Sequence, residues 1–320
     1  MRRTRWGIRS SFRRTIYYLL ANDYQRLGNE CLIQGKDGFN AVYITDLEAW
    51  CNIEFSSLNS NPLCYAHHLY LNNEEVKDLI IPESITELSD AAFQGCSGLT
   101  SVVIPNSVTE IGNETFAGCS GLTHLEIPNS IKDIPLRTFE GCSGLRSVVI
   151  PNSITRIGSG AFRDCTSLKS VEIPNSVNTI WSSAFKGCTG LTDLYIGGLF
   201  YIQEDVFSNC NSLEKIVVWA DTPPFGEPNT FDTFTYSNAT VYAREETLDR
   251  MKNAHPWYMF SKFMPVDENG VEEIATDKSD IPYDIVNLNG QVVKSNATQS
   301  DIDALSPGIY IIGGRKVVIK

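Results

Sequence analysis

Hydrophobic and polar positions recur along this chain with a period of 23 residues. The pair Ile-Pro stands at Ile81-Pro82 and returns at that spacing up to Ile173-Pro174, after which Ile196-Gly197 keeps the register without Pro. Three further columns, of Phe, Cys and Leu, recur with the same period, and the last unit is one residue shorter. The columns are Phe93, Phe116, Phe139, Phe162, Phe185 and Phe207; Cys96, Cys119, Cys142, Cys165, Cys188 and Cys210; and Leu99, Leu122, Leu145, Leu168, Leu191 and Leu213. Self-similarity at such a period is typical of stacked repeats.

Each unit predicts one short strand. Leu99-x-x-Val102-x-Ile104 has the L-x-x-L-x-L spacing of a leucine-rich repeat, and Pro105 ends the strand. Phe116 and Cys119 then fill the opposite side of the coil. Seven such strands about 4.8 Å apart form a sheet roughly 30 Å across. We expect a leucine-rich repeat solenoid with a right-handed α/β-type coil, a parallel β-sheet on its concave face and an irregular or short helical convex side.

The segments outside the repeats differ from them in pattern. The linker 266–274 is acidic, and the tail after it contains two hairpin signals, Asn289-Gly290 and Gly313-Gly314, each between apolar runs. We therefore expect a small all-β C-terminal domain. The predicted segments are a basic, poorly ordered N-terminal arm at 1–41, a cap or degenerate repeat at 42–75, repeats at 76–218, a second cap at 219–265, the linker at 266–274 and the tail at 275–320.

Charge and composition narrow the classes of function. The net charge is −12 over 320 residues, which argues against nucleic-acid binding because that needs clustered Lys and Arg. Residues 1–26 hold seven Arg and one Asp, so they carry +6 and the remainder −18. This start fits a basic arm, a weak secretory signal or a mitochondrial presequence, and a wrongly assigned start codon also stays open. No apolar run of transmembrane length is found in the sequence.

The repeat strings resemble the BspA-like leucine-rich repeats of bacterial surface proteins. The resemblance rests on the I-P-[NE]-S-[IV], F-x-G-C and G-C-[ST]-G-L strings, in register from Val76 to Val218. Residues 42–71 resemble the cap or degenerate repeat of Bacteroidetes members, and Thr240-Val-Tyr242 with Trp257 is similar to their C-terminal cap of strand, short helix and Trp. The tail is similar to type IX secretion sorting domains. The resemblance implies a cell-surface or secreted location, although no convincing signal peptide is found.

The cysteines, which most readily suggest catalysis or metal binding, are explained by a structural role. Gln94-Gly-Cys96-Ser-Gly98 approaches a cysteine-nucleophile pattern, but Gly-Cys-Ser-Gly recurs in the same column at Cys119 and Cys142, and all six repeats have the Cys. A nucleophile needs one Cys beside a base. We expect the Cys column to consist of buried free thiols. Cys51 and Cys64 are better candidates for a disulfide if the protein is exported. No zinc-binding or phosphate-binding motif is found in the sequence, so no cofactor, metal or catalytic site is predicted.

The candidate binding surface is the outward side of the predicted sheet. Side chains alternate along a strand, so two positions of each strand face outward, one column being largely polar and the other mixing apolar side chains with Glu and Tyr. The predicted partner-binding residues are Asp78, Ile80, Ser101, Val103, His124, Glu126, Ser147, Val149, Ser170, Glu172, Asp193, Tyr195, Lys215 and Val217.

The repeats and the resemblance together predict a non-enzymatic surface or secreted binding protein. Its partner is expected to be an extracellular or host protein. Two alternatives stay open, namely a glycan-binding accessory module for nutrient capture and an enzyme built from the cap and tail. Aromatic residues along a groove would favour the glycan, and Tyr195 is the one aromatic residue among the predicted face positions.

Overall fold

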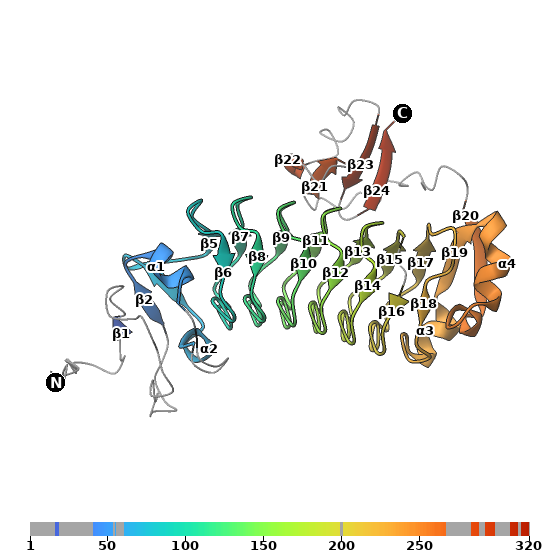
Figure 1. Cartoon of the computed structure of the whole chain (residues 1–320), viewed down its shortest axis with the longest axis horizontal. Coiled ribbons are helices and arrows are strands. Elements are labelled where there is room, and N and C mark those ends of the chain that lie inside the picture. The colour runs from blue at the N-terminus through green and yellow to red at the C-terminus, as the bar shows by residue number, and fades with distance from the viewer. Residues whose placement is uncertain are drawn as a thin grey trace.

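The computed structural model is a row of stacked coils with a cap at each end (Figure 1). It describes residues 41–53, 55, 61–198 and 201–266, and the backbone of 17–18, 283–287, 292–297, 308–312 and 315–319. Each coil adds one strand to a first row of parallel strands, called the first ladder, and the C-terminal cap adds two more. The strands are β5 (Asp78–Ile80), β7 (Ser101–Val103), β9 (His124–Glu126), β11 (Ser147–Val149), β13 (Ser170–Ile173), β15 (Asp193–Ile196), β17 (Lys215–Val218), β19 (Thr240–Arg244) and β20 (Lys262–Val266). They pair in three sheets, β5 with β7, β9 with β11, and β13 through β20. The predicted leucine-rich repeat solenoid is confirmed.

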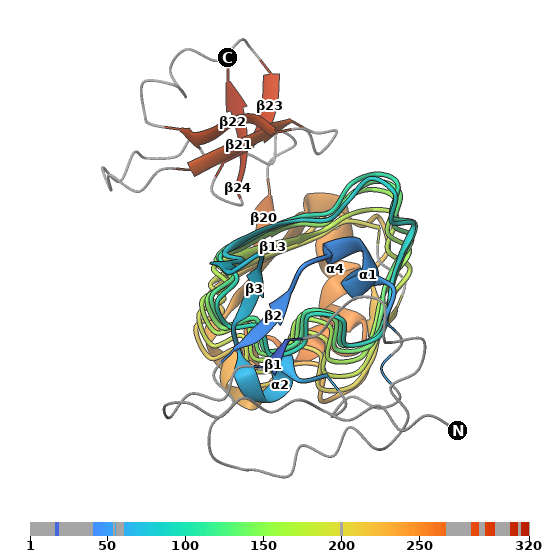
Figure 2. The same ribbon diagram turned by 90° about the vertical axis from the view of Figure 1, so that its left-hand side faces the viewer.

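The repeat columns become the core of the stack. In Figure 2, which looks along the row, the coils overlie one another. The six Phe side chains are fully buried and form a continuous stack, with neighbouring ring centroids 5.1–5.7 Å apart. The Leu column and the central strand residues, such as Leu125 and Val171, fill the space behind the first ladder. A coil has no core of its own, so the stack is stable only when its neighbours cover it.

The opposite side of the array carries a second row of parallel strands rather than helices, and we call this row the second ladder. Each strand in it has two residues, the second of which is buried. These strands are β6 (Glu87–Leu88), β8 (Glu110–Ile111), β10 (Asp133–Ile134), β12 (Arg156–Ile157), β14 (Thr179–Ile180), β16 (Tyr201–Ile202) and β18 (Phe225–Gly226). They pair in two sheets, β6 with β8 and β10 through β18. Of the two alternatives expected for the convex side, irregular or short helical, the helical one is wrong for residues 76–198 and 201–218. No helix is found among them.

Two left-handed backbone positions in each coil explain why helices are excluded. One precedes the Phe by two residues and includes Glu114 and Arg137, with φ of 55° and 51°. The other follows the Phe by two residues and is Gly in four of the six coils, as at Gly141 with φ of 71°. A left-handed residue interrupts the run of right-handed backbone that a helix requires, and Gly adopts it at no steric cost. The chain therefore turns tightly around each Phe.

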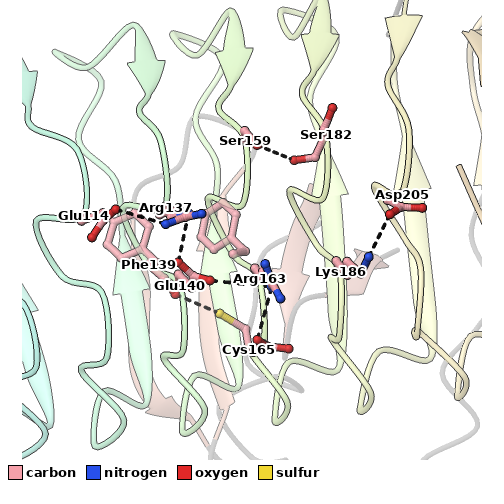
Figure 3. Close-up of polar contacts among 12 residues, drawn as sticks. Glu114, Arg137, Phe139, Glu140, Ser159, Arg163, Cys165, Ser182, Lys186 and Asp205 are labelled. Atoms are coloured by element: carbon pink, nitrogen blue, oxygen red, sulfur yellow. Dashed lines mark hydrogen bonds and ion pairs between the residues drawn. The ribbon is translucent and has the colours of Figure 1, made fainter.

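Polar contacts join neighbouring coils along this side (Figure 3). Each thiol from Cys119 onward donates to the carbonyl of the Phe in the preceding coil, as Cys165 does to Phe139 at 3.3 Å. Arg137 lies between the buried carboxylate of Glu114 and that of Glu140, at 3.5 and 3.4 Å. Farther along, Lys186 pairs with Asp205 at 2.8 Å.

The N-terminal cap closes the first coil with side-chain donors. It contains β2 (Val42–Ile44), α1 (Leu47–Cys51), α2 (Leu63–Ala66), β3 (Leu69–Leu71) and β4 (Glu74–Glu75). The buried Trp50 indole donates to the Ala92 carbonyl at 3.0 Å. The buried Asn61 amide donates to the carbonyls of Ala91 and Ala92 at 2.6 and 3.1 Å. The Ala92 carbonyl, which a further coil would satisfy as Phe93 N–H satisfies the Thr115 carbonyl, is thus satisfied by the cap.

The C-terminal cap contains α3 (Thr233–Asn238), α4 (Glu245–Asn253) and the 3₁₀ helix η3 (Trp257–Met259). The buried Trp257 indole donates to the Pro224 carbonyl at 2.6 Å and packs edge-on against Phe231. The order of strand β19, helix α4 and Trp257 matches the predicted cap.

Four strands of the tail form one antiparallel sheet in the order β22, β21, β23, β24. These strands are β21 (Tyr283–Asn287), β22 (Val292–Ala297), β23 (Gly308–Ile312) and β24 (Arg315–Ile319). That they form a separate domain stays a prediction, as do the segment boundaries. In the N-terminal arm, β1 (Tyr17–Tyr18) pairs with β2. The rest of the arm and the linker beyond Val266 lie outside the described residues.

Candidate functional site: the strand face

The outward side chains of the first ladder form two parallel columns, which we call the strand face. The central residue of each strand from β5 to β17 points into the core and is buried, so its two neighbours point outward. Strand register aligns the columns: Ile80 lies beside Val103, and Glu172 beside Tyr195. The sheet therefore holds these side chains in fixed rows.

Twelve of the fourteen predicted residues are at least partly exposed in this arrangement. Ile80 and Val103 are the most exposed apolar side chains of the face, at 66% and 55%. Asp78 is exposed as well, and the rest are half-buried. The half-buried members are Ser101, His124, Glu126, Ser147, Val149, Glu172, Asp193, Tyr195 and Lys215.

Two predicted residues are buried, and their assignment as accessible contacts is wrong. Ser170 is 5% exposed and Val217 is 2% exposed. Val217 lies in register between Tyr195 and Tyr242, whose larger rings flank it. Ser170 is a short side chain beside the longer Asp193. Alternation sets the direction of a side chain, whereas its neighbours decide how much solvent reaches it.

Hydrogen bonds join the polar column across neighbouring strands. Ser101 Oγ donates to Asp78 Oδ1 at 2.5 Å, and His124 Nδ1 lies 2.9 Å from Ser147 Oγ. Within a single coil, Thr192 Oγ1 donates to Oδ2 of the next residue, Asp193, at 2.6 Å. These contacts orient side chains before any ligand arrives. A pre-organised surface loses less conformational entropy on binding.

The C-terminal cap extends the face beyond the predicted set. Strands β19 and β20 continue the register, which places Thr240 and Lys262 in one column and Tyr242 and Met264 in the other. The Lys215 ammonium lies 5.4 Å from the centre of the Tyr242 ring. The alternation in Thr240-Val-Tyr242-Ala is the sequence signal that indicates this extension.

The six cysteines of the repeat column are buried free thiols. Burial raises the pKa of Cys96 and of Cys142 to about 12, so neither is a thiolate at neutral pH. The candidate disulfide between Cys51 and Cys64 is not formed in this structure, where Cys64 Sγ lies 3.1 Å from Gln94 Oε1. Across the described ranges, no cluster of three or more His, Cys, Asp or Glu residues is arranged to hold a metal ion.

Comparison with known families decides the class of the repeats. The family described as "BspA type Leucine rich repeat region" matches in six copies over residues 66–192 and 132–240, together more than half of the chain. The chain belongs to the BspA-type leucine-rich repeat family. The matched region contains all the predicted face residues. No curated protein matches the chain.

Several solved bacterial structures are similar to part of the chain. A leucine-rich repeat protein from T. pallidum is 28% identical, with a TM-score of 0.42, over 52% of this chain and 73% of the other. A leucine-rich repeat protein from Eubacterium ventriosum is 21% identical, with a TM-score of 0.41, over 45% and 40%. A leucine-rich cell surface protein from Faecalibacterium prausnitzii is 21% identical, with a TM-score of 0.33, over 60% of each. The matches span less than two thirds of the last two proteins.

In the described parts of the chain, none of the helices has both the length and the apolar composition needed to cross a bilayer.

Proposed function

We propose that this BspA-type protein is a non-enzymatic binding protein, secreted or displayed on a cell surface, whose strand face binds an extracellular or host protein. The observation that carries the proposal is the exposed apolar pair Ile80 and Val103. Ile80 and Val103 lie side by side on the paired strands β5 and β7. Asp78 on β5 and Glu126 on β9 add carboxylates to the same face. Contact surfaces between proteins commonly combine apolar side chains with a polar rim.

The dimensions of the strand face also support a protein partner. Nine strands about 4.8 Å apart give a face roughly 40 Å long. A standard interface buries about 800 Å² per partner, which a surface of this length supplies. Four carboxylates and one Lys among the predicted residues make the face acidic. We therefore expect a partner that presents basic and apolar groups.

The proposed surface location is supported by the family resemblance, and the similar F. prausnitzii protein is described as a cell surface protein. The tail's likeness to type IX sorting domains fits the same proposal. Protease treatment of intact cells that express the native gene tests it. A chain that is cleaved while the cells stay intact supports display, whereas a chain protected until lysis contradicts it.

A comparison of charge-reversal variants tests the binding surface. The face variant is Glu126→Lys with Glu172→Lys. The matched control is Glu87→Lys with Glu110→Lys, two exposed carboxylates in register on the second ladder. Immobilised wild-type and variant chains are exposed to extracellular protein, and the retained proteins are quantified by mass spectrometry. The proposal predicts proteins retained by wild type and control but lost from the face variant; parallel losses from both variants contradict it.

A further inference from the structure

A strip of aromatic side chains lies on the second ladder and the adjoining cap, away from the strand face. We call Trp181, Tyr201, Phe225, His255 and Tyr258 the aromatic strip. Ile180 and Ile202 are buried, so the residues beside them, Trp181 and Tyr201, face outward. Phe225 is 55% exposed and Trp181 43% exposed. The strip is thus an exposed feature that neither the core nor the strand face accounts for.

Ring contacts hold the strip in place. The Tyr201 and Phe225 rings are stacked with centroids 5.7 Å apart, and the Phe225 and His255 ring centroids are 6.2 Å apart. His255 meets Tyr258 edge-on at 5.5 Å. Trp181 stacks on no ring of the described residues, so its indole is available to a ligand. Aromatic rings in fixed positions provide apolar area without a large loss of conformational freedom.

Polar side chains alternate with these rings. In the column of Trp181, the next two coils place Gln203 and Glu227. Gln203 Oε1 accepts from Ser182 N and Oγ, both at 3.0 Å, which leaves the amide N–H groups of Gln203 as donors. Glu227 Oε1 accepts from the Tyr201 hydroxyl at 2.6 Å, and its second oxygen remains an acceptor. The surface therefore offers apolar rings, an amide donor and a carboxylate acceptor.

We propose that the aromatic strip binds a short neutral glycan. A pyranose presents C–H groups that pack on the negative face of an aromatic ring, while its hydroxyls pair with amide and carboxylate groups. The strip and its interleaved polar residues contain no Lys or Arg, and Glu227 repels phosphorylated or sulfated ligands. The strip covers three strands, or about 10 Å, and part of the cap, which is small for the roughly 800 Å² that a protein partner needs.

Saturation-transfer NMR on the full chain tests the proposal. The probes are cellohexaose, xylohexaose, mannohexaose and maltohexaose, with a heparin-derived hexasaccharide as the anionic comparison. Saturation transfer to at least one neutral hexaose is expected. Trp181→Ala with Phe225→Ala should reduce it at least about fivefold. Gln203→Glu should also reduce it without removing any ring.

The matched control is Tyr65→Ala with Phe234→Ala, two rings of similar exposure on α2 and α3. This control should leave the signal unchanged. No transfer to any neutral hexaose, transfer to the heparin fragment alone, or equal losses in control and strip variants would overturn the proposal. A strip variant that turns a dimer into a monomer in sedimentation would show that a second copy covers the strip, which also overturns it.

Discussion

The thiol of Cys165 donates to the carbonyl oxygen of Phe139, one coil earlier, at 3.3 Å. Both residues are fully buried, and the same contact recurs between neighbouring coils along the array. A thiol at this position fills space as a small apolar group does and also satisfies a backbone acceptor. The Cys column therefore has a structural role in each coil from Cys119 onward.

This role predicts the stability of Cys165→Ala. The change removes the thiol donor and leaves a cavity, which should lower the free energy of unfolding by about 1–3 kcal/mol. Urea denaturation measures the loss. An unchanged free energy of unfolding would show that the contact between Cys165 and Phe139 contributes nothing to the stack.

Alkylation tests the state of the thiols. Burial raises the pKa of Cys142 to about 12, and that of Cys119 well above its ordinary value. Because the thiolate is the reactive species, iodoacetamide at pH 8 should leave the five cysteines Cys96, Cys119, Cys142, Cys165 and Cys188 unmodified until urea unfolds the chain. Peptide mass spectrometry gives the labelled fraction at each site. Rapid labelling of Cys142 in the native chain is incompatible with this packing.

Phe139 stands in the middle of the aromatic stack, between Phe116 and Phe162. Phe139→Ala should cost about 3–5 kcal/mol of unfolding free energy, because it removes a buried ring that both neighbouring coils contact. The exposed Phe234 provides a matched control, since Phe234→Ala should cost about 0.5 kcal/mol or less. Similar losses for both variants would mean that the stack is not the core of the array.

The N-terminal cap depends on Asn61, whose amide satisfies the carbonyls of Ala91 and Ala92. Asn61→Ala removes one of the two donors from each carbonyl, because Ala91 O keeps the Gln94 N–H and Ala92 O keeps the Trp50 indole. It also removes the side-chain oxygen that accepts from the buried Leu63 N–H at 2.8 Å. We expect a loss of about 1–3 kcal/mol. Hydrogen exchange should rise first in the coils nearest the cap, because an array opens from a destabilised end. Uniform acceleration along the array would argue against a local capping role.

The pair of Lys186 and Asp205 predicts a pH dependence. Its hydrogen bond lowers the pKa of the Asp205 carboxyl in the folded state. The stabilisation is therefore present above the unfolded pKa of about 3.9 and is lost as the pH falls through the lower folded value. Lys186→Met should lower stability by roughly 0.2–1 kcal/mol at pH 7, since the pair is partly exposed. The urea midpoints of wild type and Lys186→Met are compared at pH 7, where Asp205 is ionised, and at pH 2. A difference between the two chains that is the same at both pH values contradicts the assignment.

The repeat columns could be read from the sequence because each position is filled by one residue type in every coil. Phe139 and Cys142 recur at a fixed spacing, so their burial and stacking follow from the period alone. The second ladder could not be predicted in the same way. Strands of two residues, such as Arg156–Ile157, are too short to show alternation. The left-handed backbone at Glu114 and Arg137 gave no signal either, since neither residue is Gly.

The sequence does not predict contacts between residues that only the folded chain brings together. The burial of Val217 follows from two Tyr residues in adjacent strands, one of which belongs to the cap. The aromatic strip joins Tyr201 and Phe225, which align only because the last coils depart from the 23-residue period. Cys51 and Cys64 are close in sequence, yet Cys64 faces Gln94 in the first repeat. Sequence spacing alone therefore could not settle their pairing.

The most direct test of the central proposal, that the strand face binds a protein, is an equilibrium measurement on a purified partner obtained from the retention comparison. Biolayer interferometry gives the Kd for wild type, for Glu126→Lys with Glu172→Lys, and for the control Glu87→Lys with Glu110→Lys. Thermal unfolding confirms that all three chains fold equally. We expect the face variant to lose binding, whereas the Kd of the control should stay within about twofold of the wild-type value. Equal Kd values for the face variant and wild type would contradict it.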